Sequence, residues 1–600
     1  MTRIALVHPY SWPAVRRGGE RYLHDLAWYL TGQGAEVDIV ISGRPGIEQT
    51  ADGRIVRLRQ LRPLRVGRLT TDDVFGLSAL AWLARHRYDV VHALIPTAAL
   101  AAVTTRQPIV YTALGHPTAE TIDRRKGDRA MFRATVRRAG APLALSASAA
   151  DHIEQLSGRR PRVVPPGLRI SEFPLRDEPR VGPPRILFPA NASDQRKCLD
   201  VLLAAFPAVL DRHPDAELLL GGGGGTRWAF DRLDPAERDR VQRATRDIGA
   251  GELGDVAARY AEATVSVLPS VDEAFGLVLV EALATGTPVV GVASGGPTEI
   301  VDDPLIGRLA KPRDPETLAD AICAVIELAA DPATARRCNE HARRWDWTQT
   351  VGPLHLDVYA SVNPRVRSSA LGVPESRMAV NAHGVYAIPR SSEHRPAATA
   401  VLSGQVWERE TVDLLRACDP TGDVVHAGTF FGDFIPAIAR SRTDGARVYA
   451  FEPNSENFRC AQTTVELNHL DNVVLTNAAL DNHSGSADLA IRSPDGLALG
   501  GGSRLVEATT NASATEKVQL TSIDEVVPAD RHVAVVQLDV EGHEQEALLG
   551  ALATIRRCRP LLVLESRPEP EWIATHLGDL GYTMTDEVCG NAVFSPSSRG

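Results

Sequence analysis

The chain has 600 residues, too many for one hydrophobic core, and this length predicts about three or four domains. Its apolar content of 44%, charged content of 23% and formal net charge of −10 are those of an ordinary globular protein, which excludes a disordered chain. The longest weakly apolar run, around "ALIPTAALAAV", is far shorter than the ~20 residues that span a bilayer, so we expect a cytoplasmic protein. The seven scattered cysteines contain no C-x-x-C and support neither a disulfide framework nor a zinc site.

From residue 1 to about residue 175, apolar strand-like runs alternate with helical stretches, from "RIALVHP" to "RVVPPG". This region is basic, because residues 1–170 hold 25 Lys and Arg against 14 Asp and Glu. Much of the excess lies in "DRRKGDRAMFRATVRRAG", residues 123–140. The segment is either a solvated arginine-rich helix or a face that meets an anionic acceptor or a membrane surface.

A second series of alternating strands and helices, residues 176–362, runs from "PRILFPA" and ends in a helix near Val362. Residues 363–400 are rich in Pro, Ser and Arg with weak periodicity, and we interpret them as a linker with some extended structure. A third series occupies residues 401–600. Such alternation predicts an α/β fold with parallel sheets covered by helices on both faces.

The stretch "DEAFGLVLVE" reads best as a loop that enters a helix. Glu273 and the amides of Phe275, Gly276 and Leu277 then lie at the helix N-terminus, and Glu281 lies about one turn inside it. Free N–H groups at that end favour a phosphate, and the two carboxylates can accept hydroxyls on either side of it. A hydroxyl-rich ligand with a phosphate in its middle is a nucleotide sugar.

Other candidate site residues follow the first strand of each of the first two series. Gly18 and Gly19 open a helix and let backbone approach a ligand. Arg196 and Lys197 stand just before a helix, where they could grip a diphosphate. Lys197 is one of only four lysines among 65 basic residues.

With these residues in view, "PSVDEAFGLVLVEALATGTPVVGVASGGPTEIV" resembles the E-x7-E signature of the retaining GT-B glycosyltransferases of family 4. The resemblance covers about 360 residues and implies two Rossmann-like domains, 1–175 for the acceptor and 176–362 for the donor. It implies that Glu273 binds donor-sugar hydroxyls and Glu281 the ribose. The amides of residues 275–277 then meet the phosphates, assisted by Arg196 and Lys197, without a metal. A glycosidase also uses two carboxylates, but here one would be committed to ribose.

Two positions depart from that family's pattern. Its usual Gly-Arg pair before the lysine is replaced by Asn191-Ala192, which leaves Arg196 to supply the charge. The histidine of the acceptor domain corresponds to His116 with a shift of about two places, so His116 is either a catalytic-site residue or polar surface.

The third series begins with "DVVHAGTFFGDF", a strand followed by a turn with Gly428 and Gly432. This spacing differs from G-x-G-x-x-G and argues against an NAD-dependent oxidoreductase. Glu452 ends the next strand, where an adenosine ribose places its hydroxyls. The loop "DVEGHE" concentrates acidic and histidine side chains at a later strand end, either as ordinary helix capping or as a site.

The order of these pieces resembles a class I S-adenosylmethionine methyltransferase of the FkbM type, and the match includes "D-x-E-G-x-E" from Asp539 to Glu544. The resemblance implies S-adenosylmethionine bound by Gly428, Gly432, Glu452 and Asp539, and methylation of a hydroxyl. The base would be His543 or Asp539. The carboxylates could instead hold Mg2+. His426 stands where many members have an aspartate.

We therefore expect a bifunctional enzyme, a retaining glycosyltransferase fused to an O-methyltransferase, acting on a small-molecule, glycan or glycolipid acceptor and not on nucleic acid. The alternative is an active glycosyltransferase whose methyltransferase half is a degenerate binding module. The arginine-rich, lysine-poor composition suggests a GC-rich bacterial genome, which makes natural-product tailoring or cell-surface glycan synthesis the setting.

Overall fold

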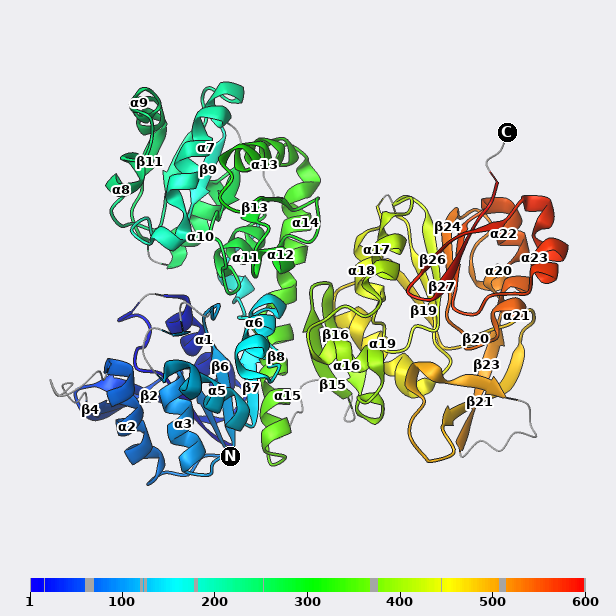
Figure 1. Cartoon of the computed structure of the whole chain (residues 1–600), viewed down its shortest axis with the longest axis horizontal. Helices are drawn as coiled ribbons and strands as arrows, with labels where there is room; N and C mark the ends of the chain where they lie inside the picture. The colour runs from blue at the N-terminus through cyan, green and yellow to red at the C-terminus, as the bar shows by residue number, and fades with distance from the viewer. Residues whose placement is uncertain are drawn as a thin grey trace. The chain divides into compact units, whose positions relative to one another are not determined.

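The computed structural model describes residues 2–15, 17–59, 70–118, 122–123, 127–176, 182–251, 253–366, 376–443, 445–506 and 514–597. The chain forms two compact units, Met1–Ala370 and Leu371–Gly600 (Figure 1). Among the helices of the described residues, none has the length and apolar character needed to cross a bilayer.

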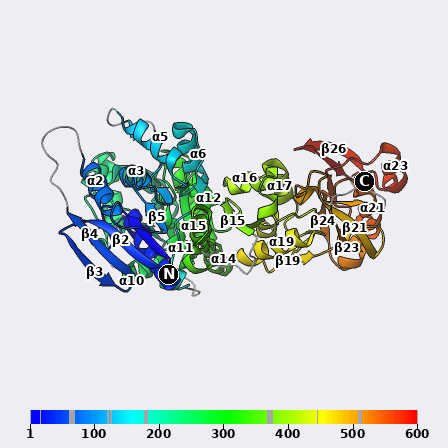
Figure 2. The ribbon, with the colours of Figure 1, turned by 90° about the horizontal axis from the view of Figure 1, so that it is seen from below.

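The first unit begins with an eight-stranded sheet in the order β3-β4-β2-β1-β5-β6-β7-β8, which is parallel except at β3. Figure 2 shows the edge formed by β2, β4 and β3. Buried strands such as β1, of which Ile4 to Val7 are at most 1% exposed, are apolar because helices cover both faces of the sheet. The strands are Arg3–Val7 (β1), Glu36–Gly43 (β2), Gly46–Thr50 (β3), Gly53–Arg59 (β4), Val90–Ala93 (β5), Ile109–Ala113 (β6), Ala141–Ala144 (β7) and Arg162–Val163 (β8); the helices are Gly18–Gly32 (α1), Thr71–Leu83 (α2), Pro96–Thr104 (α3), Asp128–Arg138 (α5) and Ala147–Ser157 (α6).

The second sheet of this unit has six strands, all parallel, in the order β11-β10-β9-β12-β13-β14. Its strands are Arg185–Phe188 (β9), Glu217–Leu220 (β10), Thr245–Asp247 (β11), Val265–Val267 (β12), Val289–Val292 (β13) and Gly307–Ala310 (β14). The helices that follow in this part are Leu199–Arg212 (α7), Arg227–Phe230 (α8), Pro235–Ala244 (α9), Leu253–Glu262 (α10), Leu277–Ala284 (α11), Pro297–Ile300 (α12), Pro315–Leu328 (α13) and Pro332–Ala342 (α14). The predicted α/β alternation is confirmed in both sheets.

The last helix of the first unit, α15 (Gly352–Val362), ends at the predicted residue but returns to the first sheet. It packs on β6 and β7, and the Tyr359 hydroxyl lies 2.8 Å from Nδ1 of His92 on β5. His355 likewise pairs with Tyr22 of α1 at 2.6 Å. The helix at the end of the second series therefore completes the core of the first sheet.

The second unit is built on a seven-stranded sheet in the order β19-β18-β17-β24-β25-β27-β26, in which β27 is antiparallel to both of its neighbours and the other strand pairs are parallel. A four-stranded sheet has the order β20-β23-β21-β22, and its strands lie between β19 and β24 in the sequence. The main strands are Asp423–Ala427 (β17), Val448–Phe451 (β18), Val473–Thr476 (β19), Val533–Leu538 (β24), Leu561–Leu564 (β25), Thr583–Val588 (β26) and Asn591–Ser595 (β27); the smaller sheet has Ala479–Leu480 (β20), Gly485–Arg492 (β21), Arg504–Val506 (β22) and Ala514–Thr521 (β23). Its helices are Arg409–Ala417 (α17), Ile435–Arg440 (α18), Ser455–Leu467 (α19), Ile523–Val526 (α20), Glu544–Leu549 (α21), Leu552–Cys558 (α22) and Pro570–His576 (α23).

The predicted linker, residues 363–400, differs from the structure over its second half. Residues 376–402 form a hairpin, β15 (Ser376–Asn381) and β16 (Gly384–Pro389), and the helix α16 (Pro396–Leu402), all in the second unit. Tyr386 of β16 is fully buried and packs edge-on against Phe431. Weak periodicity misled the prediction because both faces of the hairpin are buried, so no polar alternation marks its strands.

Candidate functional site

The segment from Glu273 to Glu281 adopts the predicted loop and helix. Helix α11 begins at Leu277, preceded by Gly276 with φ of 101°, and no side chain caps its first turn. Gly296 closes on this loop from behind, since a Cβ there would lie 2.3 Å from the Cα of Phe275. No side chain caps these amides, so the expectation that they meet an anionic ligand stays a prediction.

Lys197 and Glu273 meet at this helix N-terminus. Nζ of Lys197 lies 2.5 Å from Oε2 of Glu273, and both side chains are about three-quarters buried. Arg196 behaves differently, because its side chain is 85% exposed and pairs with Asp194 at 2.6 Å. The tertiary structure thus joins only the second member of the predicted basic pair to the carboxylate.

Glu281 lies one turn inside α11, and it is 5% exposed. One of its oxygens accepts from Arg21 of α1, and the other accepts from the hydroxyl of Tyr260 at 2.7 Å. Burial raises the pKa of this carboxyl, while the Arg21 guanidinium opposes the rise. Neither partner was predicted, since Arg21 is 260 positions away and no local pattern marks it.

Arg21 belongs to a buried charge network of the first unit. Asp25 lies 3.5 Å from Arg21 and 2.8 Å from Arg169, and Arg169 stands over the ring of Trp28. The network ties α1 to the segment before the second sheet. It holds the glycine-opened start of α1 against the helix that carries Glu281.

Gly19 and His116 each lie after the carboxyl end of a strand of the first sheet, β1 and β6. A Cβ on Gly19 would lie 2.8 Å from Cδ1 of Leu114, whereas Gly18 faces open space. Nε2 of His116 lies 3.2 Å from the hydroxyl of Ser148. Burial and the nearby ring of His152 lower the pKa of His116, although the charge of Glu273 opposes this. Burial thus favours the neutral form of the His116 imidazole, and its pKa also responds to the charge of Glu273.

Glu299 on α12 is a residue that the sequence analysis missed. Its carboxylate accepts from the backbone N–H groups of Ala147 and Ser148, each at 3.1 Å, at the start of α6. Burial raises the pKa of Glu299 to about 7. Glu299, from the part of the unit built on the second sheet, therefore caps the N-terminus of α6, which covers the first sheet. One of the two residues that it contacts, Ser148, also lies next to His116.

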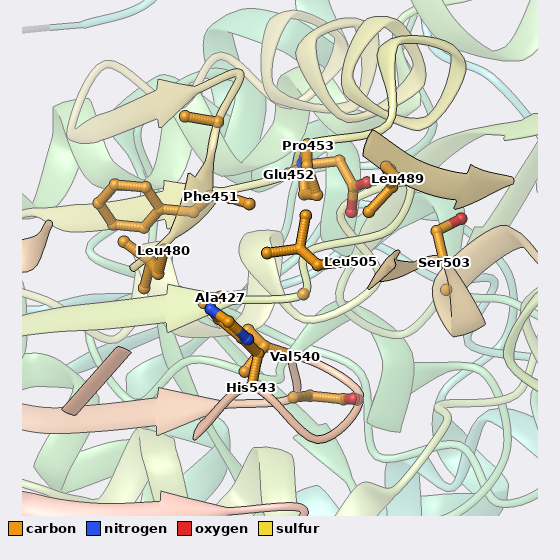
Figure 3. A pocket seen from close by; sticks show the side chains of 15 residues that line it. Ala427, Phe451, Glu452, Pro453, Leu480, Leu489, Ser503, Leu505, Val540 and His543 are labelled. Carbon is orange, nitrogen blue, oxygen red and sulfur yellow. The ribbon is translucent and has the colours of Figure 1, made fainter. Parts of the chain in front are cut away.

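The second unit holds a narrow pocket of about 30 Å³ at the carboxyl ends of β17 and β18 (Figure 3). Glu452 and Pro453 lie on one side of it, His543 and Val540 lie on the other, and Leu505 stands between them. Gly428, with φ of 79°, forms part of the wall, and a Cβ there would lie 1.7 Å from the carbonyl oxygen of Asp539. Only glycine fits this turn.

Glu452 is 3% exposed and accepts from the amides of Phe430 at 2.7 Å and Asn454 at 2.9 Å. Burial raises its pKa to about 8, against these donors. The carboxylate therefore shapes the turn after β17 as well as lining the pocket. Gly432, with φ of 84°, packs near Thr464 and lies outside the pocket lining.

The predicted cluster at Asp539 to Glu544 divides between two cavities. His543 lines the narrow pocket, and its Nε2 lies 2.8 Å from Oδ2 of Asp481. Glu544 is buried and accepts from the amide of Val540. Glu541 lines a second cavity, of about 160 Å³, and Asp539 lines both cavities. Gly428 also lines both cavities.

Glu565, at the end of β25, joins Asp539 and Glu541 in that second cavity. One oxygen of each residue lies within 4.8 Å of those of the other two. Burial and the facing carboxyl of Glu565 raise the pKa of Asp539 well above its usual range. The sequence analysis missed Glu565, although its place after a buried strand, like that of Asp539, was the available signal.

The comparisons with known proteins match the three parts of the chain in turn. Residues 16–172 match the model described as Glycosyltransferase Family 4, residues 183–328 the model of Glycosyl transferases group 1, and residues 423–587 the Methyltransferase FkbM domain.

Similar proteins cover the first unit. A D-inositol 3-phosphate glycosyltransferase 1 of Catenulispora acidiphila is 31% identical, over 60% of this chain and 96% of its own length. A glycogen synthase of Mycobacterium tuberculosis is 32% identical over 42% of this chain, which spans 60% of that relative's length. Among solved structures, the sucrose-phosphate synthase of Thermosynechococcus elongatus is 25% identical, with a TM-score of 0.49, over 60% of this chain and all of its own.

Two parallel α/β sheets, with the uncapped N-terminus of α11 after the fourth strand of the second, define a glycosyltransferase of the GT-B class, followed by a methyltransferase domain. The chain belongs to the family-4 glycosyltransferases and carries an FkbM methyltransferase domain at its C-terminal side. The family resemblance and the fold class expected from the sequence are confirmed.

Proposed function

We propose that this chain is a bifunctional enzyme. Its first unit transfers a sugar, with retention of configuration, from a nucleotide sugar to a cytoplasmic acceptor, and its second unit methylates a hydroxyl with S-adenosylmethionine. Residues 1–175 bind the acceptor, residues 176–362 the donor and residues 401–600 the methyl donor. The setting is the synthesis of a natural product or a cell-surface glycan.

The observation that carries the glycosyl half is the meeting of Lys197 and Glu273 at the uncapped N-terminus of α11. The donor's diphosphate fits the amides of residues 275–277, with Lys197 as the cation that stabilises the leaving group. Glu273 then accepts hydroxyls of the sugar, and Glu281, already oriented by Arg21 and Tyr260, accepts those of the ribose. His116 contributes from the acceptor side.

The acceptor follows from the chemistry of the relatives and of the cleft. The relative from Catenulispora acidiphila is named for D-inositol 3-phosphate, a polyol that carries a phosphate. In this chain the acceptor side supplies the imidazole of His116 and the hydroxyl of Ser148. We therefore favour a polyol or glycolipid headgroup. The basic residues of the first 170 positions favour an anionic group on it, and they suit peripheral contact with a membrane surface.

The methyl half rests on the kinds of residue that line the narrow pocket, which suit the parts of S-adenosylmethionine. The Gly428 turn lets backbone approach a ligand, Glu452 is a buried acid at a strand end that suits ribose hydroxyls, and Leu480 and Val540 offer apolar contact for an adenine ring. The cofactor supplies an electrophilic methyl group. Asp539 borders both cavities and is our candidate for positioning the acceptor hydroxyl, while His543 is on the cofactor side.

One experiment tests both halves on the intact chain. Donor hydrolysis with a panel of nucleotide sugars, followed by mass spectrometry, should identify one preferred donor. Titration calorimetry should detect S-adenosylmethionine binding that Glu452→Ala abolishes while donor hydrolysis is unaffected, because the two sites stand on separate sheets. If Glu452→Ala binds the cofactor normally, the cofactor site is wrong.

The narrow width of the pocket favours the second candidate function, a methyltransferase half that only binds another molecule. Leu505 stands in the middle of the space that the cofactor would need. If the methyltransferase half is only a binding module, the wild type should bind no S-adenosylmethionine. Leu505→Ala should then open the space for the cofactor and allow binding, but without methyl transfer. Methylation by wild type would exclude it.

A further inference from the structure

The cavity beside the cofactor pocket is strongly acidic. Among its described lining residues, five carboxylates face one guanidinium, that of Arg395; the carboxylates belong to Glu408, Asp433, Asp539, Glu541 and Glu565. Solvent reaches the cavity through the exposed Glu565, while the other acids are half-buried. Like charges gathered in this way raise each other's pKa unless a cation compensates them.

Three of these acids already have the spacing of a coordination shell. Asp539, Glu541 and Glu565 each present one oxygen within 4.8 Å of the other two. Carboxylate oxygens bind Ca2+ at about 2.3–2.6 Å, so oxygens on opposite sides of one ion lie about twice that far apart. Three oxygens within 4.8 Å of one another can therefore face a single ion, and small side-chain shifts would suit the shorter bonds of Mg2+ or Mn2+.

A second, independent observation comes from His426 on β17. This residue is 2% exposed and lines the same cavity. Its Nδ1 pairs with Gln537, and its ring stacks on Phe434, which fixes the orientation of the imidazole. Its Nε2 is buried and has no hydrogen-bond partner among the described residues. A buried nitrogen without a partner is costly, and a bound ion or its water would satisfy it.

We infer that the cavity is a divalent-cation site, in which Asp539, Glu541 and Glu565 bind the ion and Nε2 of His426 faces it directly or through a water. The ion would lie between the cofactor pocket, which Asp539 and Gly428 also line, and the space open to an acceptor. Mg2+, Mn2+ and Ca2+ are the ions that this oxygen-rich set suits. The ion's role would be to hold an acceptor oxygen beside the methyl group. The site extends the proposed function but does not depend on it, because cation binding can be measured without cofactor or acceptor.

The test uses the intact, metal-depleted chain and Mn2+ as the probe, read by electron paramagnetic resonance of the free ion. Wild type should bind one Mn2+ tightly, with Ca2+ and Mg2+ as competitors. Asp539→Asn and Glu565→Gln should each weaken that site at least tenfold. Because Glu565 is exposed, its substitution should leave the fold intact, which circular dichroism checks.

The matched control is Glu571→Gln, an exposed acid of α23 outside the cavity, which should bind Mn2+ like wild type. His426→Asn should weaken binding several-fold, and unchanged affinity would overturn the part assigned to its Nε2. Absence of a tight site in wild type, or equal affinity in Asp539→Asn, Glu565→Gln and wild type, would overturn the inference. Displacement of Mn2+ by millimolar methylammonium would overturn it as well, since the cavity would then serve an amine.

Discussion

The replacement Glu281→Gln separates two roles of this carboxylate, which are to bind the ribose hydroxyls of the donor and to hold the guanidinium of Arg21. An ionised carboxylate offers about four lone-pair sites, and Arg21 and Tyr260 occupy two of them. The other two could accept both hydroxyls of a ribose. Glutamine keeps the shape of the side chain but loses the charge and half of its acceptor capacity.

Hydrogen bonds to a charged group contribute about 1.5–3 kcal/mol, and tenfold in affinity corresponds to about 1.4 kcal/mol. Glu281→Gln should therefore weaken nucleotide binding by about tenfold to about 150-fold. It should also lower the free energy of unfolding, since removing one partner of a buried ion pair costs about 3–5 kcal/mol. The loss should fall at the lower end, because Asp25 remains 3.5 Å from Arg21.

The assay compares the preferred nucleoside diphosphate with its 2′,3′-dideoxy analogue by calorimetry. Wild type should favour the ribose form by the factor just derived, and Glu281→Gln should hardly distinguish the two. Urea unfolding of the same samples reports stability. Glu262→Gln, an exposed acid on α10, is the matched control and should change neither quantity. If Glu281→Gln loses stability but still prefers the ribose form, Glu281 only holds Arg21 and the reasoning is refuted.

Three further predictions follow from the same structure. Lys197→Met should lower kcat for donor cleavage by about 10²–10³, whereas Arg196→Met, paired with Asp194 in solvent, should lower it much less; equal effects in initial-rate assays would contradict this. A fragment that spans residues 371–600 should unfold cooperatively. A fragment that begins at Met378 should be less stable, because it truncates β15, so equal denaturation midpoints of the two fragments would argue against the hairpin's place in the core. Burial lowers the pKa of His355 from 6.5 to about 4. Its contribution to stability is therefore complete above pH 6.5, and up to about 3 kcal/mol of the free energy of unfolding is lost as the pH falls to about 4. His355→Gln should flatten that dependence in unfolding titrations of residues 1–370, and an unchanged slope would rule His355 out as its cause.

Short-range patterns in the sequence were sufficient for several features. Apolar runs predicted the strands, their alternation with helical stretches predicted the α/β sheets, and α11 begins where the Phe275-Gly276 loop indicated. The GT-B and methyltransferase families were expected from the resemblance of local motifs. Gly428 was predicted as part of a glycine turn between a strand and a helix, and its positive φ and close backbone approach explain why only glycine fits there. These features depend on neighbours along the chain, so a local pattern contains the information.

The tertiary structure alone decided which side chains meet. Lys197 reaches Glu273 while the adjacent Arg196 turns to Asp194, a choice that two consecutive basic residues leave open. Arg21, which pairs with Glu281, is 260 positions away in the sequence, and Glu565 comes from a different strand end from Asp539 and Glu541. Packing also placed the 376–402 hairpin in a core that its composition did not suggest. Such pairings arise from the stacking of helices and strands, and their residues carry no mutual spacing that a single sequence could reveal.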